Sequence, residues 1–199
     1  MNKNCGVLFD LDGVFYISNQ AIDGGQKAIN LLRKNDIPIR FLTNTTTKPR
    51  NVICDKLNKF GLEVYENEIF SASYIGINYL RSIGSPPCHL LIHENIYSDY
   101  AEFEMQNKKP EYVVIGDRGH VWNYDDMNQA FNYLKEGAKL IALHKGRFFQ
   151  TSDSLEIDIG AFVAGLEYSS GKQAISLGKP NPHFFQVALD DMSRKSEEV

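Results

Sequence analysis

The sequence predicts an α/β protein built on a parallel sheet, and three observations support this prediction. Short apolar runs, such as Val7–Phe9 and Ile37–Leu42, are typical of strands that are buried on both faces. Segments with helical spacing of apolar residues follow these runs after short joins, and this alternation indicates parallel βαβ units. Polar residues come directly after both runs, and open α/β sheets bind ligands at the carboxyl ends of their strands.

The first part of the chain alternates strands with helices. Ala28, Leu31 and Leu32 mark the apolar face of a helix that we expect to end at Asn35-Asp36. After the second strand, Thr47 and Pro49 resemble an N-cap and a first-turn proline. The predicted elements in chain order are a strand over 7–9, a helix ending at 35–36, a strand over 37–42, a helix that Gly61 ends, and a helix over 73–82 that Gly84 ends.

The composition changes at Gly84-Ser85-Pro86-Pro87, where we place a hinge. A second αβ series follows, in which Asn123 is expected to cap a helix and Gly137 to end it. The predicted strands of this part cover 89–93, 112–115, 140–143 and 174–177, and its predicted helices cover 125–135, 161–168 and about 183–192.

Composition limits the classes of function. The 199 residues, of which 43% are hydrophobic, suit one medium domain or a domain with a smaller companion. A net charge of −4 gives no electrostatic reason to expect a nucleic-acid partner. The three cysteines have no Cys-x-x-Cys spacing, and we interpret them as the reduced thiols of a cytoplasmic protein. The sequence lacks an apolar run of membrane-spanning length and a signal-peptide core, so we expect no membrane association.

Asp10-Leu11-Asp12-Gly13 is the first candidate for chemistry. A carboxylate at a strand end can attack phosphorus or carbon and form an ester, and a second carboxylate nearby can donate and accept the proton. Together they favour a hard cation such as Mg²⁺. A calcium loop is excluded because its sixth and twelfth positions, counted from Asp10, would be Phe15 and Ala21. An ordinary turn capped by Asp remains the alternative for this stretch taken alone.

Three further residues suit a phosphate ligand. Thr43 offers a hydroxyl and Asn44 a backbone N–H after the second strand, and Lys179 offers an ammonium in a Gly-Lys-Pro turn. Each alone is typical of a turn or a solvated loop. With Asp10 and Asp12 they fit phosphoryl transfer through an aspartyl-phosphate. A receiver-type signalling domain uses similar residues, but it has no room for the long segment before Lys179.

The chain resembles the haloacid dehalogenase-like phosphatase superfamily. Val7-Leu8-Phe9-Asp10-Leu11-Asp12-Gly13-Val14 matches the first motif of this superfamily, Phe41-Leu42-Thr43-Asn44 the second, and Gly178-Lys179-Pro180 the third. The long segment between the second and third motifs is similar to that of the NagD-like subclass. This resemblance implies a Rossmann-like parallel-sheet core over 1–82 and 177–199, with an inserted α/β cap domain over 83–176.

The same resemblance implies residue roles. Asp10 would be the nucleophile and a Mg²⁺ ligand, and Asp12 would be the acid and base, with its carbonyl on the metal. Thr43 and Lys179 would hold the phosphoryl group of a small phosphorylated substrate. The cap residues expected to face this substrate are His144, Arg147, Phe148 and Asp158, although Phe148-Phe149 could instead belong to the cap core.

The fourth motif of the superfamily, a strand ending in Gly-Asp-Asp, is the departure from this pattern. It should follow Lys179 and is not found in the sequence. Val114-Ile115-Gly116-Asp117 resembles it but precedes Lys179, and we interpret Asp190-Asp191 as a solvated helix face. We therefore expect a C-terminally truncated chain with impaired activity. The alternative is a non-catalytic phosphate-binding or dimerisation domain, and we also consider a homodimer.

Overall fold

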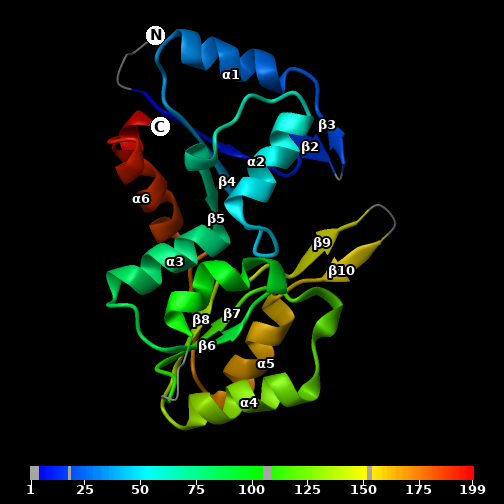
Figure 1. The fold of residues 1–199 in the computed structure, drawn as a ribbon, viewed down its shortest axis with the longest axis vertical. Coiled ribbons are helices and arrows are strands. Elements are labelled where there is room, and N and C mark those ends of the chain that lie inside the picture. Colours follow the sequence, from blue (N-terminus) through cyan, green and yellow to red (C-terminus); the bar gives the residue numbers. More distant parts are fainter. Residues whose placement is uncertain (1–4, 18, 105–108, 152–153) are drawn as a thin grey trace. The chain divides into compact units, whose positions relative to one another are not determined.

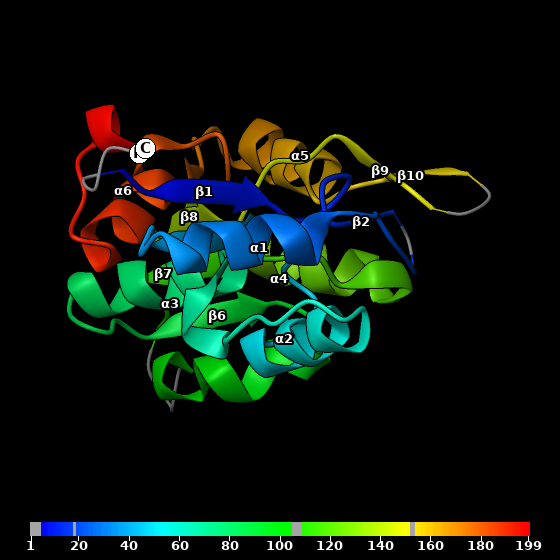
Figure 2. The same cartoon turned by 90° about the horizontal axis from the view of Figure 1, so that it is seen from above.

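A computed structural model describes residues 5–17, 19–104, 109–151 and 154–199. The chain divides into two compact units, and the predicted α/β class with parallel sheets is confirmed. Unit 1 contains Met1–Thr43, Arg50–Ser71 and Lys179–Val199, and unit 2 contains Asn44–Pro49 and Ala72–Gly178. Figures 1 and 2 show the elements of each unit from two directions.

Unit 1 contains a three-stranded parallel sheet with the order β1-β4-β5. Its strands are β1 (Val7–Asp10), β4 (Ile39–Thr43) and β5 (Ile69–Ser71). The short strands β2 (Tyr16–Ile17) and β3 (Gln20–Ala21) form an antiparallel hairpin directly after β1. In the β1–β4 pair, Phe9 lies opposite Phe41 and Asp10 opposite Leu42. The two strands therefore end at the same edge of the sheet.

The helices of unit 1 are α1 (Gly25–Lys34), α2 (Arg50–Lys59) and α6 (Pro182–Asp191), with 3₁₀ turns η1 (Glu66–Glu68) and η4 (Ser196–Glu198). Ile29 of α1 and Leu57 of α2 pack in one core with Phe41 of β4. In Figure 1, α6 (red) lies on the opposite side of β4 and β5 from α2. Asp190 and Asp191 of α6 are exposed, as a solvated helix face requires, and Asp191 Oδ2 also accepts a hydrogen bond of 2.6 Å from Arg40 Nε of β4 and forms an ion pair with it.

β1 is only partly buried, whereas the sequence predicts a strand buried on both faces. Val7–Phe9 have intermediate exposure because, within the described residues, β4 is the one strand that pairs with β1. The N–H of Gly6 donates to the carbonyl of Glu198 (2.8 Å). A side chain at position 6 would hinder this approach, since a Cβ there would lie 3.3 Å from Met192 and from Val199.

Unit 2 contains a four-stranded parallel sheet with the order β11-β8-β7-β6. Its strands are β6 (Cys88–Leu91), β7 (Tyr112–Ile115), β8 (Lys139–Ala142) and β11 (Ile175–Ser176). The helices α4 (Tyr124–Lys135) and α5 (Gly160–Ser170) pack on one face, and α3 (Ala72–Ser82) and the 3₁₀ helix η2 (Glu94–Phe103) lie on the other (Figure 1). Asn123 caps α4 as predicted, because its side chain accepts a hydrogen bond from the Asp126 N–H.

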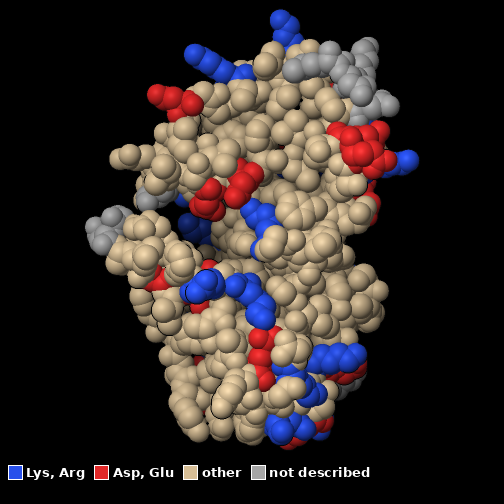
Figure 3. Space-filling model, turned by 180° about the vertical axis from the view of Figure 1, so that it is seen from behind, with Lys and Arg blue, Asp and Glu red and all other residues tan. Residues whose placement is uncertain are grey.

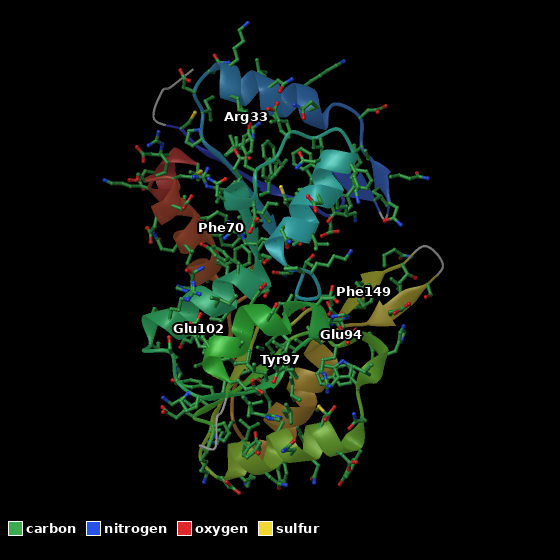
Figure 4. All side chains as sticks on the ribbon, in the orientation of Figure 1. Arg33, Phe70, Glu94, Tyr97, Glu102 and Phe149 are labelled. Atoms are coloured by element: carbon green, nitrogen blue, oxygen red, sulfur yellow. The ribbon has the colours of Figure 1, made fainter. Side chains whose placement is uncertain are left out.

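The longer segment of unit 2 starts at Ala72, whereas the sequence predicts a hinge at Gly84. The reason is that α3 packs with η2: the buried Tyr100 hydroxyl donates to the Ser73 carbonyl (2.7 Å), and Arg81 pairs with Glu102. Glu102 is labelled on η2 in Figure 4. These contacts place α3 in unit 2.

An antiparallel hairpin, β9 (Phe148–Gln150) with β10 (Leu155–Ile157), follows the loop after β8, and a short 3₁₀ turn, η3 (Gly119–Val121), precedes α4. On the face of the molecule drawn in Figure 3, basic and acidic side chains are interspersed among uncharged ones. Among the described residues, none of the helices has the length and hydropathy that a bilayer crossing needs.

Replacing Gly76 tests the packing of α3. A Cβ at this position would collide with the Tyr100 hydroxyl and the Leu143 side chain, and Tyr100 is fully buried. We expect Gly76→Ala to lower the free energy of unfolding by about 1–3 kcal/mol, despite the higher helix propensity of Ala. The matched control is Gly165→Ala in α5, where the nearest atom is 4.0 Å away and the stability should stay equal or rise. Equal effects of the two substitutions in urea unfolding would contradict this packing.

Candidate active site

The pairing of β1 with β4 places two candidate residues at one edge of the unit 1 sheet. Asp10 is the last residue of β1 and lies opposite Leu42, the residue before Thr43. About half of the Asp10 side chain is exposed, and its Oδ1 accepts a hydrogen bond of 2.8 Å from the Leu11 N–H. The carboxylate therefore lies accessible at the strand end, held by the backbone that follows it.

A tight turn places Asp12 after Asp10. Leu11, between the two carboxylates, is fully buried in the core. Gly13 adopts a φ of 78°, a left-handed conformation that glycine tolerates and most residues avoid, and its N–H donates to the Tyr16 carbonyl (2.8 Å). The buried leucine and the closed turn fix the backbone on both sides of Asp12.

Lys179 lies beside Asp10 although 169 residues separate them in the chain. Its Nζ donates to Asp10 Oδ1 (2.5 Å) and to the carbonyl of Leu42 (3.1 Å). Two residues after this lysine, Asn181 caps α6 by accepting a hydrogen bond from the His183 N–H. The ammonium therefore contacts both strands at the edge where they end and offsets the charge of Asp10.

A hydroxyl contacts Asp12, and a tyrosine lies across the turn from it. Thr43 Oγ1 donates to Asp12 Oδ2 over 3.3 Å, a long hydrogen bond, and Tyr16 forms an isolated β-bridge with Asp12. Burial and the negative charges of Asp12 and Asp10 raise the pKa of Tyr16 above its ordinary value. Nothing in the spacing of Tyr16 distinguishes it from a core aromatic residue, so the sequence alone does not indicate its place at this turn.

The last residue of the second motif, Asn44, and the first residue of the third, Gly178, lie close together in unit 2. A Cβ at Gly178, the residue before Lys179, would lie only 2.9 Å from Asn44 Oδ1. Glycine at this position is therefore required for the close approach of the two loops. Asn44 follows Thr43 directly and brings its backbone N–H to the same end of β4.

The donors at the end of β1 fit Mg²⁺ by their chemistry. Mg²⁺ in proteins is usually held by one or two carboxylates, with water and substrate phosphate filling the remaining positions. Asp10 and Asp12 supply carboxylate and backbone carbonyl oxygens at an exposed strand end. Within the residues that the structure describes, no group of three or more His, Cys, Asp or Glu side chains is placed to hold a metal. These two residues would therefore depend on water and substrate for the other ligands.

The structure places the four predicted cap residues in unit 2, around the start and end of the β9–β10 hairpin. His144 is buried, and its Nδ1 accepts a hydrogen bond from the Gly146 N–H (3.1 Å) while Nε2 lies 3.8 Å from Asp158 Oδ1. Arg147 and Phe148 are exposed. Their contact with a substrate remains a prediction.

The pKa of His144 is lowered. Burial is the main cause, and the negative charges of Asp158 and Asp117 oppose it. Asp117, from the segment that resembles a fourth motif, belongs to this unit and donates its N–H to Thr46 Oγ1 (3.0 Å). Since Nδ1 accepts a hydrogen bond, the neutral ring carries its hydrogen on Nε2, toward Asp158.

Comparisons with known proteins agree with the motifs. Residues 7–106 match the family described as "Haloacid dehalogenase-like hydrolase". Phospholysine phosphohistidine inorganic pyrophosphate phosphatase of Rattus norvegicus is 37% identical over 190 residues, which cover 92% of this chain and 69% of the rat protein. The chain belongs to the haloacid dehalogenase-like hydrolase family. The resemblance predicted from the motifs is thereby confirmed.

Two further relatives support membership of the haloacid dehalogenase-like hydrolase family. Haloacid dehalogenase-like hydrolase domain-containing protein 2 of Mus musculus is 35% identical over 193 residues, covering 97% of this chain and 73% of its own length. A variant of the thermostable p-nitrophenylphosphatase from Bacillus stearothermophilus has a similar structure, with a TM-score of 0.87 and 27% identity. That comparison covers 100% of this chain and 78% of the other chain.

The lowered pKa of His144 predicts a loss of stability in acid. The unfolded chain binds a proton on this residue below a pH of about 6.5, whereas the folded chain resists it until a lower pH. The free energy of unfolding should therefore fall as the pH drops below about 6.5, by up to about 1.4 kcal/mol per pH unit for one proton. The pKa of His89 is also lowered by burial, so it adds to the effect.

Urea unfolding between pH 7 and pH 5 measures this dependence. We expect His144→Asn to give a shallower pH dependence than the unaltered chain, whatever its effect on absolute stability. His120→Asn, at an exposed histidine of the same unit, serves as control and should leave the dependence unchanged. An unchanged slope in His144→Asn would contradict the assignment.

Proposed function

We propose that the chain is a Mg²⁺-dependent phosphatase that hydrolyses small phosphorylated compounds through an aspartyl-phosphate on Asp10. The observation that carries this proposal is the contact of Lys179 Nζ with Asp10 Oδ1 at 2.5 Å, at the strand end where Asp12 and Thr43 also meet. The names of the relatives, which include two phosphatases, support the same reaction class.

In the first step Asp10 attacks the phosphorus atom. Its Oδ1 receives the hydrogen bonds from Lys179 and the Leu11 N–H, so Oδ2 is the oxygen that carries out the attack. The new bond joins Oδ2 to phosphorus while the bond from phosphorus to the leaving oxygen breaks. Lys179 offsets negative charge beside the phosphoryl group during this transfer.

Asp12 moves the proton in both steps. It gives a proton to the leaving oxygen as the phosphorus–oxygen bond breaks, and it then takes a proton from the water that attacks the aspartyl-phosphate. Hydrolysis releases phosphate and restores the Asp10 carboxylate. Asp12 lies beside Thr43, whose Oγ1 is 3.3 Å from Asp12 Oδ2.

The phosphoryl oxygens need donors and counter-charges. Lys179, the Thr43 hydroxyl and the Asn44 N–H would supply the donors. Asp10 and the Asp12 carbonyl would hold Mg²⁺, which when bound neutralises phosphate charge. Metal binding by these two residues alone would be weak, because most of the remaining ligands would be water.

Substrate selection is assigned in this proposal to the cap domain that the sequence analysis places over 83–176. Four residues of unit 2 carry the assignment: His144, Arg147, Phe148 and Asp158. The exposed Phe148 offers apolar area and the exposed Arg147 offers a cation, which suits an organic group and an anion of a small phosphorylated compound.

A non-catalytic phosphate-binding domain is the second candidate function. The observation that favours it is the small number of carboxylates at the site: in the described part of the chain no third acidic side chain completes a metal cluster. Such a domain would bind phosphate through Lys179 and Thr43 and release it unchanged.

Hydrolysis of p-nitrophenyl phosphate separates the two candidates. We expect turnover that requires Mg²⁺ and is lost with EDTA, and a fall of about 10³-fold or more in kcat for Asp10→Asn, because the amide is a poor nucleophile. Asp23→Asn, which alters an exposed carboxylate of the same unit, is the matched control and should retain the activity. Saturable phosphate binding without turnover would favour the non-catalytic domain, and full activity of Asp10→Asn would refute the proposed nucleophile.

A further inference from the structure

The β9–β10 hairpin of unit 2 depends on its base for its placement. Its two strands pair with each other and with no other described strand, and the hairpin extends away from the sheet of the unit (Figures 1 and 2). A two-stranded hairpin is at best marginally stable in water by itself. Its apolar side chains Phe148, Leu155 and Ile157 are exposed. The contacts where the hairpin joins the unit therefore decide where its side chains are held.

Backbone contacts close the base of the hairpin beyond its last strand pair. The Asp158 N–H donates to the Arg147 carbonyl (3.2 Å), and the Gly160 N–H donates to the Gly146 carbonyl (2.8 Å). A Cβ at Gly160 would collide with that same carbonyl, so this approach needs glycine. Ile159, between Asp158 and Gly160, is fully buried in the core of unit 2. The base of the hairpin is thus tied to this core.

The side chain of Asp158 fills the space inside the base. A Cβ on Gly146 would collide with Asp158 Oδ2, so the carboxylate occupies the place that a side chain at position 146 would take. Its Oδ1 accepts a hydrogen bond of 2.7 Å from the Ile159 N–H and lies 3.8 Å from His144 Nε2. Only 13% of this side chain is exposed. Asp158 therefore packs against the loop that enters the hairpin, from the segment that leaves it.

A second carboxylate holds the same loop from α5. Glu167 accepts two hydrogen bonds from Lys145 Nζ, of 3.0 and 2.8 Å, and one of 2.8 Å from the Ala174 N–H. Lys145 comes directly before Gly146, against which Asp158 packs. The loop is thus held at two neighbouring residues, and the next residue along the chain is the exposed Arg147.

We propose that Asp158 is a positioning residue that fixes the base of the β9–β10 hairpin and so sets where Arg147 and Phe148 meet the substrate. The inference rests on the proposed function, in which these two exposed residues bind an anion and the organic group of a small phosphorylated compound. The largely buried Asp158 would then select substrates through its neighbours. Binding residues reach productive geometry only when packing and hydrogen bonds around them hold them there.

This role predicts that binding of the organic group and binding of the phosphoryl group respond differently to the loss of Asp158. Without its side chain the hairpin base can shift, so Arg147 and Phe148 lose their fixed places. Thr43 and Lys179, which hold the phosphoryl group in the proposed function, belong to unit 1. Inorganic phosphate has no organic group, and its binding should therefore not change.

The test compares Asp158→Ala with the unaltered chain in the presence of Mg²⁺. We expect KM for p-nitrophenyl phosphate to rise about 10-fold, with kcat and the inhibition constant of inorganic phosphate each changing about 2-fold or less. Asp158→Asn, which keeps the shape of the side chain, should restore most of the affinity. The control is Asp125→Ala, at an exposed carboxylate of the same unit, which should change none of these constants. Any other pattern, such as an unchanged KM or a weaker inhibition by phosphate, would overturn the proposal and leave the proposed function intact.

Unfolding measurements test the contact itself, independently of turnover. Gly146→Ala should lower the urea midpoint of the unaltered chain, because the new methyl group would collide with Asp158. The same substitution should cost much less in Asp158→Ala, where the carboxylate is gone. Equal shifts in the two backgrounds would overturn the proposal, even for an active chain. If the chain binds p-nitrophenyl phosphate without hydrolysing it, which would refute the proposed function, the dissociation constant takes the place of KM in the comparison.

Discussion

The parallel pairing of β1 with β4 is the constraint on which the site depends. Neighbouring parallel strands end at the same edge of a sheet, so the register that sets Asp10 opposite Leu42 also brings Thr43 to that edge. Lys179 contacts both strands there, through the Asp10 carboxylate and the Leu42 carbonyl. A slip of one residue would turn each side chain of β1 to the other face and separate these groups. Phe9 and Phe41 are paired across the strands, and their ring centroids lie 6.0 Å apart. Because a slip would separate these stacked rings, their contact opposes it.

The contacts at this edge contribute more to function than to stability. Asp10 is about half exposed, and ion pairs in contact with solvent are worth little because water competes and salt screens them. Their effect is local: the ammonium of Lys179 contacts Asp10 and the hydroxyl of Thr43 contacts Asp12, so each of two carboxylates that would otherwise repel each other has a donor beside it. The stability of unit 1 comes instead from the apolar core that α1 and α2 share with the sheet.

Elements with long apolar patterns could be predicted from the sequence, and those without such patterns could not. The strands at β1 and β4 and the cap of α4 by Asn123 were predictable because the apolar runs and the capping residue are local signals. The hairpins β2–β3 and β9–β10 have strands of two or three residues, too short for a period to be seen. The 3₁₀ helix η2 was missed as well, since it follows no helical spacing.

The residues of the candidate site likewise differ in whether the sequence predicts them. Asp10, Asp12, Thr43 and Lys179 were predictable because each stands at a strand end in a recognisable motif, and the structure brings these four together in unit 1. The place of Tyr16 across the turn from Asp12 was not predictable, because it depends on the backbone turn at Gly13 that pairs the two residues. The burial of His144 was also not predictable, because it depends on the loop that returns Asp158 to its ring.

Trapping the covalent intermediate tests the central claim most directly. The chain would be mixed with p-nitrophenyl phosphate and Mg²⁺, quenched in acid and reduced with borohydride, which converts an aspartyl-phosphate to homoserine, and the residue would then be located by mass spectrometry of the peptides. The account predicts homoserine at position 10 in the presence of substrate and its absence without substrate. Turnover with no reduced residue at position 10, or with the reduced residue at another carboxylate, would contradict it.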